Sequence, residues 1–143
     1  MSPSLNPYLL AAAAGSLIAA LLHLGCIAFG APWYRAMGAG EGMARLAESG
    51  SWRPTLITLA ITAMLLVWAL FALSGGGAIR PLPLTKPALL AISAVLLVRG
   101  LGFVFLQPYF PGNSATFWAV SSGFCLLLGG LHAVGLYQLW SRA

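Results

Sequence analysis

Arg99 and His23 stand inside long apolar runs of this sequence, where a charged or polar side chain is least expected. Arg99 follows Ala-Ile-Ser-Ala-Val-Leu-Leu-Val, and His23 follows Ala-Ala-Leu-Leu. An arginine at membrane depth costs about 2.5–3.5 kcal/mol on insertion scales, so an intramembrane charge is by default a functional hypothesis. The guanidinium would bind an anion, and the imidazole would donate a hydrogen bond or transfer a proton.

The composition indicates that these apolar runs lie in lipid. Of 143 residues, 60% are hydrophobic and only 6% are charged, against roughly 25% charged in an average soluble domain. A water-soluble fold of this length would leave a large apolar surface facing water. We therefore expect an all-α, polytopic integral membrane protein with one membrane domain over residues 1–143.

Four segments are long enough to cross a bilayer, whose core of about 30 Å needs about 20 mostly apolar residues per helix. They lie near 8–30, 54–74, 87–107 and 115–139. Pro7, Pro54 and Pro87 stand at three of the starts, where a missing N–H does no harm. The sequence thus predicts a four-transmembrane-helix bundle, and small residues along the first and fourth spans indicate that these two pack together.

The loop over residues 31–53 is unusually long and holds both acidic residues, Glu41 and Glu48. Most connections in compact domains are about 4–6 residues. Met43, Leu46 and Ala47 share one face at helical spacing. This pattern predicts a short amphipathic helix between spans one and two, lying at the membrane surface.

Arg99 and His23 are expected in the same leaflet. With span three ending near residue 107, Arg99 lies about 12 Å below the surface that bears the first and third loops, and His23 lies about 10 Å below it. Glu41, or the hydroxyl of Tyr34, could fold back from the long loop and give Arg99 the partner that a buried cation needs. The predicted ligand-binding residues of this pocket are Arg99, His23, Tyr34, Glu41, Arg35, Gln107 and Asn113. The competing interpretation is that Arg99 extends to the interface or bonds to backbone carbonyls.

Three functional hypotheses follow from these residues. The first is a membrane protein that binds an amphipathic or anionic small molecule, lipid or quinone-like, through Arg99 and His23 under the 31–53 loop. The second is a non-enzymatic accessory subunit, or a homo-oligomer component, of a larger membrane complex. The third is a membrane-embedded enzyme that uses His23 and Glu41 for proton transfer, since their ordinary pKa values straddle a useful range.

Other partners and cofactors are disfavoured by residue type and spacing. His132 lies about 25 Å below the surface from which His23 is about 10 Å, so the two cannot ligate one haem from similar heights. Cys26 and Cys125 stand alone, with no spacing typical of a metal site. The seven Lys and Arg residues form no clustered basic patch, which disfavours nucleic acid and leaves membrane lipids as the expected partners. The identity of any cofactor stays open.

The count of Lys and Arg residues favours neither orientation of the chain in the membrane. Arg35, Arg45 and Arg53 lie in the first loop, whereas Arg80, Lys86 and Arg142 lie on the other side, so the positive-inside rule gives a tie. We expect a bacterial inner-membrane protein with cytoplasmic termini, because Glu41 and Glu48 dilute the first loop. A tie is also what a chain inserting in both orientations would show.

The four-span prediction places the loops 31–53 and 108–114 on one side of the membrane. Single cysteines introduced in these loops, in a background without Cys26 and Cys125, are expected to react with a membrane-impermeant maleimide from the same side. Labelling of the two loops from opposite sides would contradict the architecture. Equal labelling from both sides would indicate dual insertion.

Overall fold

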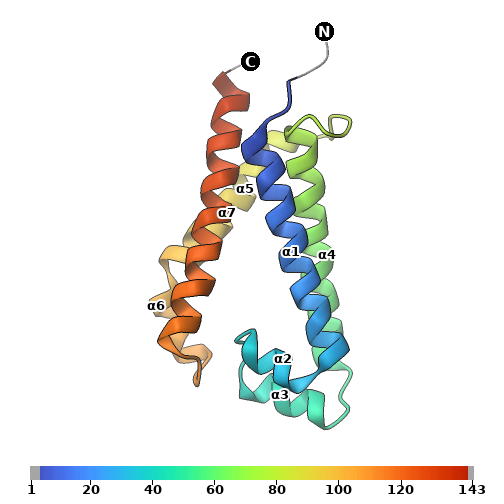
Figure 1. Cartoon of the computed structure of the whole chain (residues 1–143), viewed down its shortest axis with the longest axis vertical. Helices are drawn as coiled ribbons and strands as arrows, with labels where there is room; N and C mark the ends of the chain where they lie inside the picture. The colour runs from blue at the N-terminus through green and yellow to red at the C-terminus, as the bar shows by residue number, and fades with distance from the viewer. Residues whose placement is uncertain (1–3, 142–143) are drawn as a thin grey trace.

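The computed structural model describes residues 4–141 and folds them into helices, with no strand in that range (Figure 1). The expectation of an all-helical chain is confirmed. The four long helices are α1 (Pro7–Phe29), α4 (Arg53–Gly75), α5 (Thr85–Leu101) and α7 (Ala115–Ser141). The short elements are α2 (Ala31–Ala36), α3 (Glu41–Glu48), α6 (Phe103–Leu106) and the 3₁₀ helix η1 (Gln107–Tyr109).

Within residues 4–141, three helices are long and apolar enough to cross a membrane, namely α1, α4 and α7. Their bounds agree with the predicted spans 8–30, 54–74 and 115–139 to within two residues. The third predicted span, 87–107, is not one straight helix. The segment 103–109 is bent by 72° from α5, so the count rises to four only if the bent pair forms one span.

The bend occurs at Gly102, where α5 ends. Glycine in a helix interior costs about 1 kcal/mol relative to alanine, and a Cβ at Gly102 would lie 2.8 Å from the carbonyl oxygen of Val98. Glycine is therefore the residue that fits this bend without steric conflict. As a consequence, Arg99 lies in the last turn of α5 and not in the interior of a continuous span.

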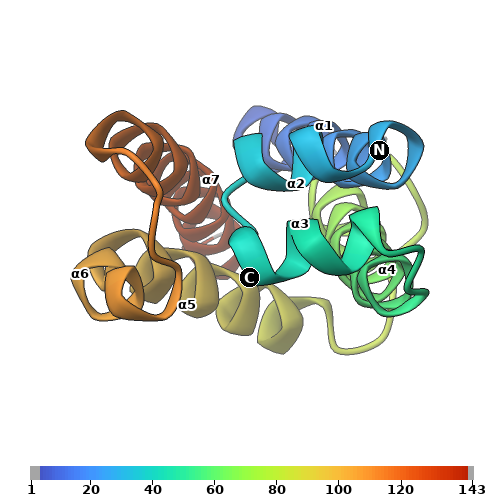
Figure 2. The ribbon, with the colours of Figure 1, turned by 90° about the horizontal axis from the view of Figure 1, so that it is seen from below.

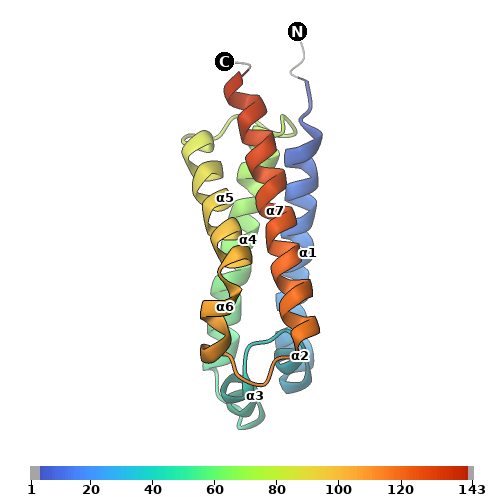
Figure 3. The same cartoon turned by 90° about the vertical axis from the view of Figure 1, so that its left-hand side faces the viewer.

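The long helices form two pairs, α1 with α4 and α5 with α7, which meet at one end and diverge toward the other (Figure 1). At the closed end α1 also contacts α7, because Gly135 accommodates the side chain of Leu9 and Gly15 accommodates that of Leu128. The predicted packing of the first and fourth spans is confirmed there. Figure 3 shows α5 and α7 side by side, with α6 following α5 toward the open end.

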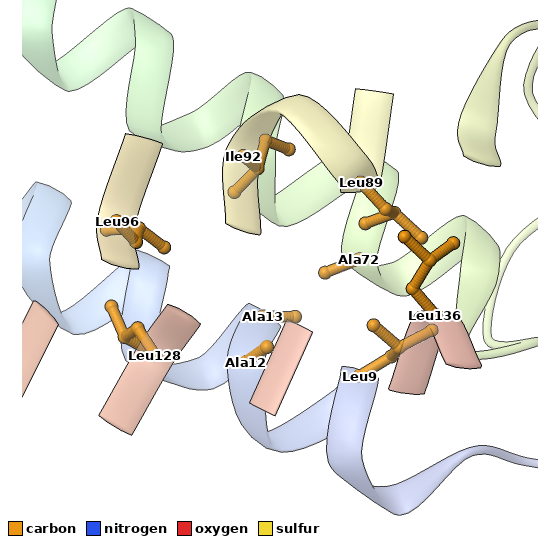
Figure 4. Close-up of a cluster of buried hydrophobic side chains, with 9 residues drawn as sticks. All are labelled: Leu9, Ala12, Ala13, Ala72, Leu89, Ile92, Leu96, Leu128 and Leu136. Carbon is orange, nitrogen blue, oxygen red and sulfur yellow. The ribbon is translucent and has the colours of Figure 1, made fainter. Parts of the chain in front are cut away.

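The largest apolar cluster lies where the two pairs meet, and its members come from all four long helices (Figure 4). Leucine and isoleucine side chains fill it, and alanines on α1 and α4 allow the backbones to approach closely. The cluster consists of Leu9, Ala12, Ala13, Ala72, Leu89, Ile92, Leu96, Leu128 and Leu136.

Asn6 closes this end of the molecule with five hydrogen bonds, one of which its carbonyl accepts from the amide of Leu10. Its side-chain oxygen accepts from the amides of Tyr8 and Leu9 and so caps α1. Its side-chain nitrogen donates to the carbonyl of Gly135 at 3.2 Å, and its amide donates to the carbonyl of Gly76 at 3.0 Å. Asn6 is only 1% exposed, and its side chain and backbone amide together tie α1 to α7 and to the C-cap of α4.

At the open end, α2 and α3 lie across α1 and α4 and form a cap, residues 31–48 (Figure 2). The predicted amphipathic helix is confirmed as α3, whereas α2 was not predicted. Met43 and Ala47 pack against a buried cluster that includes Cys26 and Tyr34. Much of the apolar face of α3 therefore contacts the protein itself, and Leu46 stays exposed.

The contact between Gly135 and Leu9 gives a test of this junction. A Cβ at Gly135 would lie 2.4 Å from Cγ of the fully buried Leu9. Gly135→Ala is expected to destabilise the protein by about 1–3 kcal/mol and to lower the midpoint of thermal unfolding in detergent. The control is Gly123→Ala on the same helix, where no atom lies within 4 Å, and we expect no loss there. Equal effects of the two substitutions would contradict the described junction.

Candidate functional site

The side chain of Arg99 is directed toward α7. Its Nη2 donates to the hydroxyl of Ser121 at 2.8 Å, and its Nη1 lies 3.4 Å from the hydroxyl of Ser122. The guanidinium also lies over the ring of Trp118, 5.4 Å from the centroid, which is the geometry of a cation–π contact. Arg99 is thus half-buried between α5 and α7 and is held by a polar face of α7.

The partners of Arg99 fix its level in the bundle. Ser121 lies six residues after Ala115, the start of α7, which corresponds to about 9 Å along the helix. His23 lies six residues before Phe29, the end of α1, also about 9 Å from the open end. The two residues share a level, as predicted, although they belong to different helix pairs.

A groove of about 580 Å³ lies beside Arg99 on the surface of α5. It forms where the chain turns at Gly102, so that α5 supplies one wall and α6 the other. Arg99 is the one charged residue in its lining, which is otherwise apolar. The groove is shallow and open, and almost none of its lining is polar, so the stem of Arg99 faces it while the guanidinium faces α7. The lining consists of Ala94, Val95, Val98, Arg99, Gly102, Phe105 and Leu106.

The prediction that Glu41 partners Arg99 is wrong in the structure. Glu41 accepts two hydrogen bonds from Arg35, at 3.0 Å from Nε and 2.8 Å from Nη2, and Glu48 accepts another from Nη2 at 2.8 Å. Arg35 is only six residues from Glu41, and the turn between α2 and α3 brings them together. The bond to Arg35 lowers the pKa of Glu41, and the bonds to Glu41 and Glu48 raise the pKa of Arg35.

Tyr34 and His23 also have local partners. The hydroxyl of Tyr34 lies 3.0 Å from that of Thr58 on α4, and Thr58 donates its own hydrogen to the carbonyl of Pro54. Tyr34 is therefore the donor and links the cap to α4. His23 Nδ1 lies 2.7 Å from the carbonyl oxygen of Ala19. Since that carbonyl can only accept, Nδ1 carries the hydrogen.

Asn113 connects the two loops of the open end. Its side-chain nitrogen donates to the carbonyl of Gly38 in the cap at 3.2 Å and to that of Phe110 at 3.2 Å. This contact agrees with the prediction that loops 31–53 and 108–114 share one side. Gln107 begins η1 and is exposed. The predicted pocket residues thus fall into separate groups at one end of the molecule.

The partners of Arg99 were not identified from the sequence. Ser121 and Ser122 interrupt the apolar fourth span at the depth estimated for Arg99, and this coincidence was the available signal. Trp118 was not among the predicted site residues. Its ring is buried and packs near Phe103 and Phe117, so it is a fixed surface for the guanidinium.

His132 belongs to the closed end of the bundle. It is fully buried, and its Nδ1 lies 2.8 Å from the carbonyl oxygen of Leu128, the type of backbone bond expected for a core histidine. It lies 17 residues after Ala115, about 25 Å along α7, whereas His23 is about 9 Å from the same end. Among residues 4–141, no group of three His, Cys, Asp or Glu could hold a metal ion.

No protein-family model, curated protein or solved structure matches the chain. The fold and site define a helical protein with three to four apolar helices of membrane-spanning length.

The ion pairs of the cap predict a pH dependence. Because Arg35 lowers the pKa of Glu41 in the folded protein, the pair stabilises the cap above the usual Glu pKa of 4.5 and loses this effect as the pH falls through the lower, folded value. Amide-exchange protection of α3, corrected for intrinsic rates, should be flat from neutral pH to about 4.5, fall between 4.5 and the lower folded pKa of Glu41, and level off below it. Arg35→Ala should reduce protection at neutral pH and flatten the profile. An unchanged profile in Arg35→Ala would contradict this role.

Proposed function

We propose that this chain is a four-span integral membrane protein that binds an amphipathic or anionic small molecule, lipid or quinone-like, at Arg99. One observation carries the proposal. The chain has only two acidic residues, and both accept hydrogen bonds from Arg35, whereas Arg99 contacts two hydroxyls and an aromatic ring. The charge of Arg99 is therefore available to an external anion.

The surface of the helices supports a membrane location. Large apolar side chains are exposed along every long helix, with Leu21 at 66%, Val98 at 70% and Val120 at 68%. In water, this much apolar surface would be unfavourable. The bent pair of α5 and the segment 103–109 supplies the fourth span in this proposal. An inner-membrane location with cytoplasmic termini belongs to the same proposal, and Arg142, which entered the charge count, lies outside the described residues.

The groove supports an amphipathic ligand. A cation that is removed from water needs a counter-charge, because its neutral partners offset only part of the desolvation cost. The apolar walls beside Arg99 would then bury the remainder of the same molecule. A ligand with an acceptor group at one end and an apolar body satisfies both requirements.

The two alternative functions have less support. The enzyme hypothesis requires proton transfer by Glu41, yet Arg35 lowers the pKa of Glu41 away from neutrality, which weakens a general acid or base. The accessory-subunit hypothesis relied on small-residue faces. Gly15 and Gly135 of those helices pack within the chain, so that hypothesis now rests on the apolar surface that lipid would also cover.

The proposal predicts the behaviour of Arg99→Leu. This change removes an insertion cost, so the protein should still insert and fold, but the small molecule retained after purification in mild detergent should be lost. Native mass spectrometry measures both the protein and its bound ligand. Arg80→Leu removes one charge at the opposite end and serves as the matched control, with ligand retained.

A second comparison separates this site from the cap. Glu41→Gln should leave ligand retention unchanged, because Glu41 bonds to Arg35 and not to Arg99. Equal ligand content in Arg99→Leu and the native protein would refute binding at Arg99. Loss of ligand in Glu41→Gln alone would instead place the binding site under the cap.

A further inference from the structure

We infer that the molecule held at Arg99 is a phospholipid, with its phosphate on the guanidinium and one acyl chain in the groove beside it. The inference rests on the proposed function and narrows its ligand class. Three features support it: the number of hydrogen-bond donors around Arg99, their level in the bundle and the apolar groove beside them.

The site at Arg99 offers more hydrogen-bond donors than a carbonyl or a carboxylate ligand can accept. A guanidinium has five N–H donors, and the two serines accept from only two of its nitrogens. Ser121 and Ser122 both act as acceptors in these bonds, and within residues 4–141 neither hydroxyl hydrogen has an acceptor. The site therefore presents free donors from Arg99 and Ser121, whereas Ser122 is buried, with 4% of its surface exposed.

A phosphate fits this donor set better than the other ligands considered. Its charged oxygens accept paired hydrogen bonds from arginine, and further oxygens of the same group remain for the hydroxyl of Ser121. A quinone offers single neutral carbonyl oxygens and leaves the charge of Arg99 uncompensated. A carboxylate has two oxygens, which the guanidinium alone can occupy.

The level of Arg99 suits a lipid headgroup. Helix α7 has 27 residues and is about 40 Å long, similar to a bilayer of about 40–45 Å that includes the headgroup regions. Arg99 contacts α7 about 9 Å from its end, which places it close to the boundary between headgroups and hydrocarbon. A lipid phosphate can therefore reach Arg99 with only a small displacement from the headgroup layer.

Part of the groove runs in the direction that a lipid tail requires. Ala94 and Val95 line it about one turn of α5 before Arg99, and α5 runs from the closed end to the open end (Figure 3). The groove extends from Arg99 in both directions, since Gly102, Phe105 and Leu106 line it beyond Arg99. Its part next to Ala94 and Val95 lies toward the middle of the helices, where an acyl chain would lie. Val98 and Phe105 in its walls are 70% and 80% exposed, so a lipid could enter sideways from the bilayer.

The test uses ligands that place different groups on Arg99, of which phosphatidic acid and dioleoylglycerol differ only in the phosphate. Purified, delipidated protein is titrated with dioleoyl phosphatidic acid, dioleoylglycerol, oleic acid, decylubiquinone and sodium phosphate, and binding is measured by native mass spectrometry. We expect phosphatidic acid to bind at least about tenfold more tightly than dioleoylglycerol or oleic acid, the effect of one charge-assisted hydrogen bond or more.

Variants assign this preference to particular groups. Arg99→Leu should abolish it, and Arg99→Lys, which keeps the charge without the planar fork, should retain only part of it. The double variant Ser121→Ala, Ser122→Ala should weaken phosphatidic acid more than oleic acid. Arg80→Leu should change neither. If Arg99→Leu does not fold, the lysine and double-serine variants carry the same comparison.

The outcomes distinguish a failure of the phosphate inference from a failure of the proposed function. If oleic acid or decylubiquinone binds as tightly as phosphatidic acid and Arg99→Leu abolishes both, the proposed function holds and the phosphate inference fails. If no probe responds to the Arg99 variants, both fail. If sodium phosphate displaces phosphatidic acid at equal concentration, the site takes a soluble anion and the lipid assignment is wrong.

Discussion

The chain has only two acidic residues, and this scarcity of negative charge determines the surroundings of Arg99. Both acidic side chains lie on α3 and bond to Arg35, so the polar groups around Arg99 are the hydroxyls of Ser121 and Ser122. Neutral hydrogen bonds and a cation–π contact, the latter worth about 0.5–2 kcal/mol, offset part of the cost of moving the guanidinium out of water. They do not neutralise its charge, which is why an external anion is the central element of the proposed function.

The architecture keeps Arg99 apart from the ion pairs of the cap. Asn6 ties three helices together at the closed end, and the helix pairs diverge from there toward the open end (Figure 1). At the open end the cap packs on α1 and α4 and contains its own ion pairs, whereas Arg99 belongs to the α5–α7 pair. The break at Gly102 then turns α6 away from α5 and creates the apolar groove next to the charge.

Most of the fold could be predicted from the sequence, and most of the site contacts could not. Apolar runs bounded by prolines and glycines specify α1, α4 and α7 closely, because length and hydropathy are properties of the chain itself. The bend at Gly102 was missed because hydropathy counts apolar residues on both sides of a break. Arg99 was identified by its residue type. Its partners depend on how α5 is rotated against α7, and Glu41 has a nearer partner only six residues away.

The distance between phosphorus and the Arg99 guanidinium shows whether a phosphate-bearing lipid binds there. With arginine labelled in its guanidinium nitrogens and the protein in phospholipid bilayers, ³¹P–¹⁵N dipolar recoupling by solid-state NMR should detect a phosphorus about 4 Å from an Arg99 nitrogen, as a charge-assisted hydrogen bond requires. Arg99→Lys identifies the signal by removing it. A guanidinium resonance of Arg99 that shows no coupling to phosphorus would contradict the account.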